Sequence, residues 1–156
     1  MPSWLYIMTF KQKIKSHYIQ LLEAKILTLQ NQIADLTTDA QNDAKGSAGD
    51  KHETALAMMH LEQEKLNQKL AENLTQKSIL EAIDCSVLHK VIALGSLVKA
   101  NEIYFFIATA LPQITLDGAT VFGVSPQAPI GVQFMGKKAG DCIQVNAITY
   151  KIESVF

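Results

Sequence analysis

Two carboxylates stand three residues apart in the segment Gly46-Ser-Ala-Gly-Asp50-Lys-His-Glu53-Thr-Ala55, which separates two long stretches of helix-forming sequence. On a helix this spacing places both side chains on one face, and Mg²⁺ often takes one or two protein carboxylates together with waters. The same pattern also resembles a capping box, in which Asp50 caps the helix N-terminus and Glu53 occupies the N3 position. A metal-facing pair and a helix cap are compatible interpretations, and both stay open at this point.

Three other polar residues lie near this pair. Asp39 and Asp43 precede the glycines and can add negative charge, although such residues more often form a solvated helix end. His52 can carry a proton, but an exposed, isolated His is usually inert. We therefore centre the candidate site on Asp50 and Glu53.

The stretches on both sides of this segment have the spacing of a coiled coil, and neither contains Gly or Pro. The apolar seam of the first recurs at intervals of three and four residues: Ile19, Leu22, Ile26, Leu29, Ile33 and Leu36. The second has Leu56, Met59, Leu66 and Leu70, with Gln63 at one seam position. The short break between them favours an antiparallel hairpin over pairing between chains. The pattern predicts a hairpin over residues 8–84 with its tip near 44–53.

The character of the sequence changes after Cys85. Short runs rich in β-branched and aromatic residues, bounded by Gly, Asn and Pro, predict strands at 87–94, 103–109, 120–124, 142–146 and 149–155. Asp117-Gly118 is a turn signal, and Ile130–Met135 predicts one short helix. We expect an α+β protein in which residues 85–156 form a small antiparallel β domain.

Composition excludes several classes of protein. The 156-residue chain has a net charge of −1, which argues against autonomous DNA binding, since such binding needs many Lys and Arg. The apolar first ten residues are too few to span a bilayer and have no basic leader, and we place no function on residues 1–7. Cys85 and Cys142 form no metal motif and are expected to be reduced thiols in a cytoplasmic protein.

Basic residues cluster near the start of the first helical stretch, at Lys11, Lys13 and Lys15. They could meet nucleic acid or a protein partner, but a solvated helix face is the expected role.

The segment Ser125–Asp141 resembles the C-terminal signature of the Gre-type transcript cleavage factors. The matching residues are Pro129, Ile130, Gly131, Gly136, Lys137, Lys138, Gly140 and Asp141, and Tyr150-Lys-Ile152 completes the match. Ala128 stands where the family has Ser. The resemblance implies an FKBP-like C-terminal domain that docks on RNA polymerase through Pro129, Gly131, Gly136, Lys137, Lys138 and Asp141. Judged by their types alone, these residues are turn formers whose glycines meet tight backbone geometry.

The hairpin segment is similar to the same family in its D-x-x-E-x-A pattern, carried here by Asp50, Glu53 and Ala55. The resemblance implies a monomeric elongation factor that binds in the secondary channel of RNA polymerase and touches nascent RNA indirectly. Asp50 and Glu53 would be its catalytic and metal residues, holding Mg²⁺ jointly with the polymerase. The chain would then be no enzyme itself but would stimulate the polymerase's own nuclease activity.

Two alternatives stay open. Thr54 replaces the family's Asn, and the usual aromatic residue a few positions later is missing, which favours a non-cleaving regulator of the DksA type that binds the same channel. A third option is an FKBP-like isomerase or chaperone, although nothing in the strands beyond Tyr104, Phe105 and Phe106 supplies the aromatic-rich pocket that such a domain needs.

Overall fold

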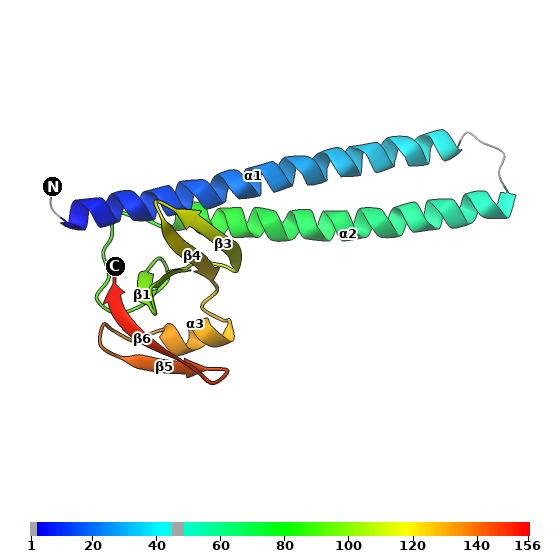
Figure 1. The fold of residues 1–156 in the computed structure, drawn as a ribbon. Helices are drawn as coiled ribbons and strands as arrows, with labels where there is room; N and C mark the ends of the chain where they lie inside the picture. The colour runs from blue at the N-terminus through cyan, green and yellow to red at the C-terminus, as the bar shows by residue number, and fades with distance from the viewer. Residues whose placement is uncertain (1–2, 45–48) are drawn as a thin grey trace. The chain divides into compact units, whose positions relative to one another are not determined.

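The structure, a computed structural model, describes residues 3–44 and 49–156. The chain divides into two compact units: one comprises the residues up to Ile19 together with Ser78–Phe156, and the other comprises Gln20–Lys77. Two helices, α1 (Ser3–Ala44) and α2 (Gly49–Ala82), contribute to both units (Figure 1). No helix in the described residues is both long and apolar enough to cross a membrane.

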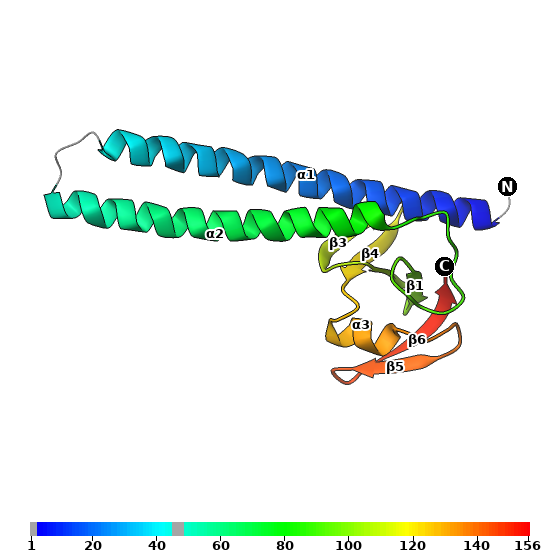
Figure 2. The same cartoon turned by 180° about the vertical axis from the view of Figure 1, so that it is seen from behind.

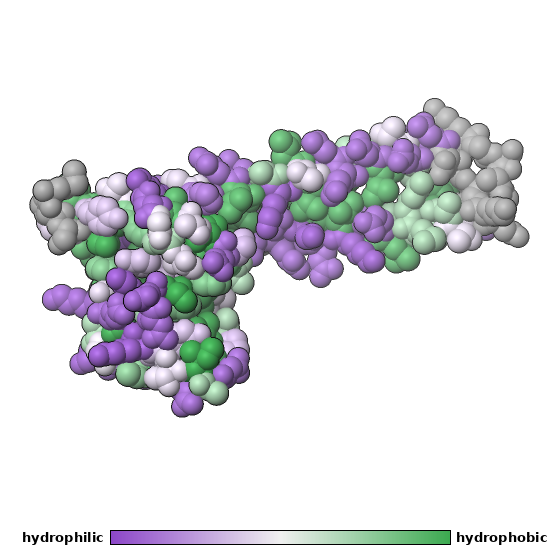
Figure 3. All heavy atoms as spheres, in the orientation of Figure 1, coloured by the Kyte–Doolittle hydropathy of each residue, from purple (hydrophilic) through white to green (hydrophobic). Residues whose placement is uncertain are grey.

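The Gln20–Lys77 unit is an antiparallel helix pair. Contacts between the helices run in opposite sequence directions: Glu23 pairs with Lys77 at 3.5 Å, and Thr37 accepts a hydrogen bond from Gln63 at 2.9 Å. The predicted seam lies inward, with Leu22, Ile26 and Leu29 buried and the later seam residues half-buried. Figure 3 shows apolar atoms between the two helices and polar atoms outside them. The predicted hairpin is therefore confirmed in its helices and in their direction.

The other unit contains a six-stranded mixed sheet and one short helix, so the predicted α+β class is confirmed. The strands are β1 (Leu97–Ala100), β2 (Ile103–Ile107), β3 (Leu111–Leu116), β4 (Ala119–Val124), β5 (Cys142–Val145) and β6 (Ile148–Val155), and the helix is α3 (Pro129–Phe134). The strand order is β3-β4-β2-β1-β6-β5. Figure 2 shows the unit from behind, with α3 beside β5 and β6.

Tight two-residue turns join three of the strand pairs. Each has both central residues at positive φ: Asn101 and Glu102 between β1 and β2, Asp117 and Gly118 between β3 and β4, and Asn146 and Ala147 between β5 and β6. This is the geometry of type I′ turns, whose twist matches that of antiparallel strands. The predicted Asp117-Gly118 turn is confirmed.

One apolar core lies between the sheet and α3. Its buried members are Ile92, Val98, Ala100, Phe105, Ile107, Val124, Phe134, Ile143 and Ile152. The Phe105 ring lies 5.2 Å from that of Phe134 and meets the Tyr150 ring edge-on at 5.7 Å. Since aromatic pairs in such geometries add to the free energy of burial, these rings fix α3 against the sheet.

Three details of the predicted sheet were wrong. Residues 87–94 form no strand; Val91 makes an isolated bridge to Lys138, and Val87, Leu88, Val91 and Leu94 are exposed. Strands β1 and β3 were missed. The sheet is also not wholly antiparallel, because β2 and β4 pair in parallel, with Tyr104 opposite Val121.

Candidate functional site

Glu53 is an exposed carboxylate near the start of α2. α1 ends at Ala44 and α2 begins at Gly49, so the predicted tip at 44–53 includes residues 45–48, which lie outside the described residues. The backbone of Asp50 belongs to α2, one residue after its start, but its side chain is not among those described, and neither is that of His52 or Asp43. The structure thus places both predicted positions at the N-terminal end of α2.

The chemistry of this donor set fits a shared metal site better than a complete one. Glu53 forms no ion pair with another described residue. In the described part of the chain no three His, Cys, Asp or Glu side chains gather in a way that could hold a metal ion. Because Mg²⁺ needs six oxygen ligands, Asp50 and Glu53 could supply only part of its coordination, and waters or a partner would supply the rest.

Asp39, the other acidic candidate near the tip, lines a groove with Asp35 and Glu62 on the helix pair. It is exposed, as a solvated helix residue would be. The structure gives no contact between Asp39 and Glu53, so Asp39 is not part of the site as described.

The segment from Ser125 to Asp141 folds as one turn, helix and turn. Pro129 occupies the first turn of α3, where its missing N–H costs no hydrogen bond. Ala128 is the N-cap residue, with extended φ and ψ. Its side chain makes no capping hydrogen bond, because it lacks the hydroxyl that a Ser would offer. Gly131 is buried against Ser125, and a Cβ on it would lie 1.9 Å from the carbonyl oxygen of that residue. This Gly is therefore required by backbone contact alone.

The second half of the segment is held by backbone hydrogen bonds. Gly136 and Gly140 have φ of +79° and +95°, which favour glycine. Asp141 accepts a hydrogen bond on its carboxylate from the Lys138 amide at 3.0 Å and donates its own amide to the Lys138 carbonyl at 3.1 Å. Asp141 thus closes the turn, while the side chains of Lys137 and Lys138 are exposed. Of the six predicted docking residues, only these two present free charge; docking itself stays a prediction for all six.

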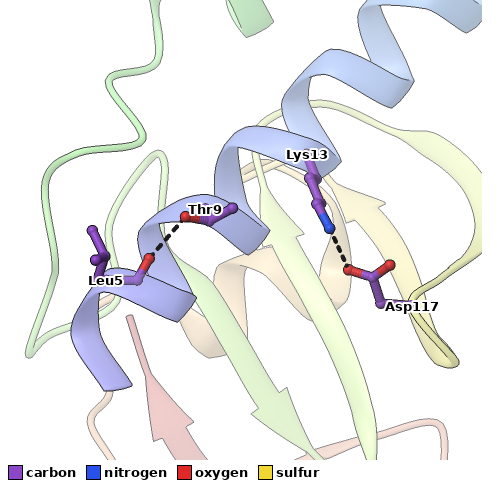
Figure 4. A network of polar contacts seen from close by, with 4 residues as sticks. All are labelled: Leu5, Thr9, Lys13 and Asp117. Carbon is purple, nitrogen blue, oxygen red and sulfur yellow. Dashed lines mark hydrogen bonds and ion pairs between the residues drawn. The ribbon is translucent and has the colours of Figure 1, made fainter. Parts of the chain in front are cut away.

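Of the lysines at the start of α1, only Lys13 is exposed as we expected; Lys11 is buried and Lys15 is half-buried. Lys11 is fully buried, and its Nζ donates hydrogen bonds to the carbonyls of Val87 at 2.9 Å and Phe156 at 3.3 Å. Lys15 donates to the carbonyl of Ile83 at 2.8 Å, and Lys13 forms an exposed ion pair with Asp117 at 3.1 Å (Figure 4). All three bind groups within the same unit, so their role is structural.

Burial also shifts the pKa values around Lys11. Desolvation lowers the pKa of Lys11, while burial raises the pKa of the Cys85 thiol, partly offset by the charge of Lys11. Cys85 and Cys142 are both free thiols, as predicted. Sequence reasoning missed this cluster because a buried Lys leaves no pattern of its own; the only signal was its place on the apolar face with Phe10, Ile14 and Tyr18.

Comparisons with known proteins find a likeness to solved structures. No protein-family model matches the chain, and no curated protein matches it. A solved structure described as "Structure of the transcription factor Gfh1" is similar, with 16% sequence identity and a TM-score of 0.35, over 88% of this chain and 92% of that chain. At this identity and TM-score the likeness carries no weight for function, so the proposal below rests on the chain's own residues.

Proposed function

We propose that the chain binds RNA polymerase and that Asp50 and Glu53 stimulate Mg²⁺-dependent cleavage of backtracked RNA in the secondary channel. The observation that carries this proposal is the exposed carboxylate of Glu53 near the N-terminal end of α2, which pairs with no other described side chain and lies within the stretch that matches the D-x-x-E-x-A pattern. The polymerase's active site cuts the RNA, and this chain is a cofactor of that reaction rather than an enzyme.

In this proposal the two carboxylates supply oxygen ligands that a weakly held Mg²⁺ lacks. When bound, Mg²⁺ neutralises charge on the phosphodiester and activates a water as the nucleophile. Asp50 and Glu53 would add oxygen ligands on one side of that ion and accept a hydrogen bond from the attacking water. A pair of exposed carboxylates is a weak site by itself, so we expect tight Mg²⁺ binding only in the complex with polymerase.

The unit that bears the sheet supplies docking in this proposal. Lys137 and Lys138 project from a turn that Asp141, Gly136 and the Ile92 backbone hold in place, with Gly136 donating to the Ile92 carbonyl at 3.0 Å. Exposed ammonium groups suit an acidic protein surface, and a rigid turn loses little conformational entropy on binding.

Backtracked elongation complexes with 5′-labelled RNA test the proposal directly. Addition of the chain should shorten the RNA in a Mg²⁺-dependent manner. Asp50→Asn with Glu53→Gln should reduce the rate at least about tenfold, because loss of ligands to a reacting ion costs several kcal/mol. Glu64→Gln, the same change on an exposed residue of the same helix, is the matched control and should act like the unchanged chain. Unaltered cleavage in the Asp50/Glu53 variant would disprove the assigned roles.

The runner-up function keeps polymerase binding without cleavage. Thr54 and the missing aromatic residue favour it, since both departures lie beside the acidic pair. The same complexes decide between the two: altered transcription from a promoter without RNA shortening supports the regulator.

The isomerase alternative loses its main structural basis. Phe105 and Phe106 are buried, and the Tyr104 ring packs edge-on against Phe10 at 5.2 Å. Phe105 and Phe106 thus pack inside the protein and Tyr104 is half-buried against Phe10, so we expect no acceleration of prolyl isomerisation in a test peptide.

A further inference from the structure

A groove of about 450 Å³ lies between the two helices of the Gln20–Lys77 unit. We propose that it binds a compact amphipathic anion, meaning a carboxylate or phosphate group on a short apolar body. The groove has apolar walls from Leu21 and Leu29, and its polar lining includes Lys25, Lys69, Gln32 and Asn73. A mostly apolar cleft of this volume with a few convergent polar groups is the usual form of a small-molecule site.

Asn73 is the most buried polar side chain in the lining of the groove. It is 8% exposed and occupies a seam position of α2, yet no hydrogen bond joins its side chain to another described residue. No fully buried side-chain nitrogen or oxygen among the described residues lacks a partner, so the Asn73 amide keeps some contact with solvent. Asn73 also lines the groove, so a ligand bound there can take the place of that solvent. A buried amide that faces a cleft can donate to a carboxylate or phosphate oxygen.

Lys25 and Lys69 supply the charge that selects an anion. They lie on different helices, and neither forms an ion pair within the described residues. Lys77, by contrast, is already paired with Glu23. Two unneutralised ammonium groups beside an apolar floor favour a ligand with one negative head, since the floor then buries the ligand's carbon atoms.

A second groove, of about 280 Å³, sets the length of the ligand. It shares Gln32 with the first groove but is lined by Asp35, Asp39 and Glu62. An acidic peptide or nucleic-acid strand lying along the helix pair would meet these carboxylates and be repelled. From Leu21 to Gln32 the first groove spans about 17 Å at about 1.5 Å per residue. A compact anion fits that length, whereas an extended polyanion does not.

This site does not depend on the proposed role in transcription, and the full ¹⁵N-labelled chain tests it by NMR. Octanoate and octyl phosphate are titrated separately, up to about 1 mM, where even weak affinity is measurable. We expect both the Asn73 side-chain amide and the backbone amides of residues 21–32 to shift on binding. Octylammonium, which has the same apolar body and the opposite charge, should leave them unchanged. The stronger of the two anions identifies the head group.

Lysine variants test the source of the selectivity. Lys69→Gln should weaken the anion about three- to fivefold, the range expected for one exposed charge interaction. Lys65→Gln, on the same helix and exposed but outside the groove, should weaken it less than about twofold. Circular dichroism checks that both variants keep their helices. The site is refuted if neither anion shifts Asn73, if octylammonium shifts it equally, or if the two variants weaken binding alike. Tighter binding of a short RNA oligonucleotide at the same amides would also overturn it.

Discussion

Gly131 lies where a methyl group has no room. The position of its missing Cβ is 1.9 Å from the Ser125 carbonyl oxygen, and the neighbouring atoms are backbone, which cannot move without distorting the turn before α3. Gly131→Ala should therefore lower the free energy of unfolding by about 3 kcal/mol or more. Gly136→Ala is the control: that site is open but has φ of +79°, so only backbone strain of about 1–2 kcal/mol is expected. Urea denaturation of both variants measures the difference, and equal costs would contradict the close contact.

Lys11 gives the sheet-bearing unit a pH dependence of predictable sign. Burial lowers its pKa from the usual 10.5, so between the lowered value and 10.5 the unfolded chain binds more protons than the folded chain. Stability contributed through Lys11 must then rise with pH across that window. Two chains isolate the effect, one that keeps Lys11 and one with Lys11→Met. Both carry Cys85→Ala, which removes the titration of the thiol. The unfolding free energy of the chain with Lys11, minus that of the Lys11→Met chain, should increase as the pH rises toward 10.5. A constant or decreasing difference would refute this.

Much of the local backbone geometry could be predicted, but hydrogen-bond partners that are distant in sequence could not. The glycines at 131, 136 and 140 were expected to meet tight backbone geometry, and the structure confirms this through a close contact and two positive φ angles. The burial of Lys11 could not be predicted, because its acceptors, the carbonyls of Val87 and Phe156, are far away in sequence. Such acceptors depend on the tertiary fold rather than on residue type.

At the scale of elements, the seam of the helix pair carries its stability. Leu29 is buried at 6% exposure, whereas Leu27 on the same helix is 59% exposed. Leu29→Ala should cost about 2–3 kcal/mol of unfolding free energy, because it removes buried methyl groups and leaves a cavity. Leu27→Ala should change it by less than about 0.5 kcal/mol. Thermal unfolding followed by far-ultraviolet circular dichroism makes the comparison, and similar costs would exclude the assigned seam.

The β5–β6 turn offers a stabilising change. Ala147 has φ of +65° at a type I′ position that glycine prefers. Ala147→Gly should raise the unfolding free energy by about 1 kcal/mol, since relief of left-handed strain exceeds the entropy lost on folding a glycine. Ala139→Gly, in an exposed turn where φ is not positive, should instead lower it by a few tenths of a kcal/mol. If both glycines destabilise the chain, the turn type is wrong.

The errors in the predicted sheet have physical causes. Residues 87–94 are mostly apolar, but only Ile92 of that stretch is buried, and its backbone bonds to Lys137 and Gly136 instead of to a strand. β3 was missed because it contains Pro112, which a central strand rarely accepts; β3 is an edge strand, where proline is tolerated. The parallel pairing of β2 with β4 arises because β4 folds back between β3 and β2, and short sequence patterns do not encode that order.

At the scale of the whole molecule, the proposed function separates binding from stimulation. Lys137 and Lys138 belong to the sheet-bearing unit, whereas Glu53 belongs to the helix pair. Substitution of Lys137, Lys138 or Glu53 should not unfold the chain, since all three side chains are exposed. Loss of the two lysines should therefore weaken polymerase binding, and loss of the carboxylates should leave binding intact while abolishing stimulation.

Competition between variants tests this separation in one assay. An excess of the Asp50→Asn/Glu53→Gln chain should occupy the polymerase and inhibit RNA cleavage stimulated by the unchanged chain, because it binds equally well but brings no metal ligands. The same excess of a chain that also carries Lys137→Glu and Lys138→Glu should inhibit far less, since charge reversal disfavours an acidic docking surface. Equal inhibition by both chains would show that the lysines play no part in docking. Absence of inhibition by the first chain, with polymerase binding measured as unchanged, would show that the two chains do not share a site.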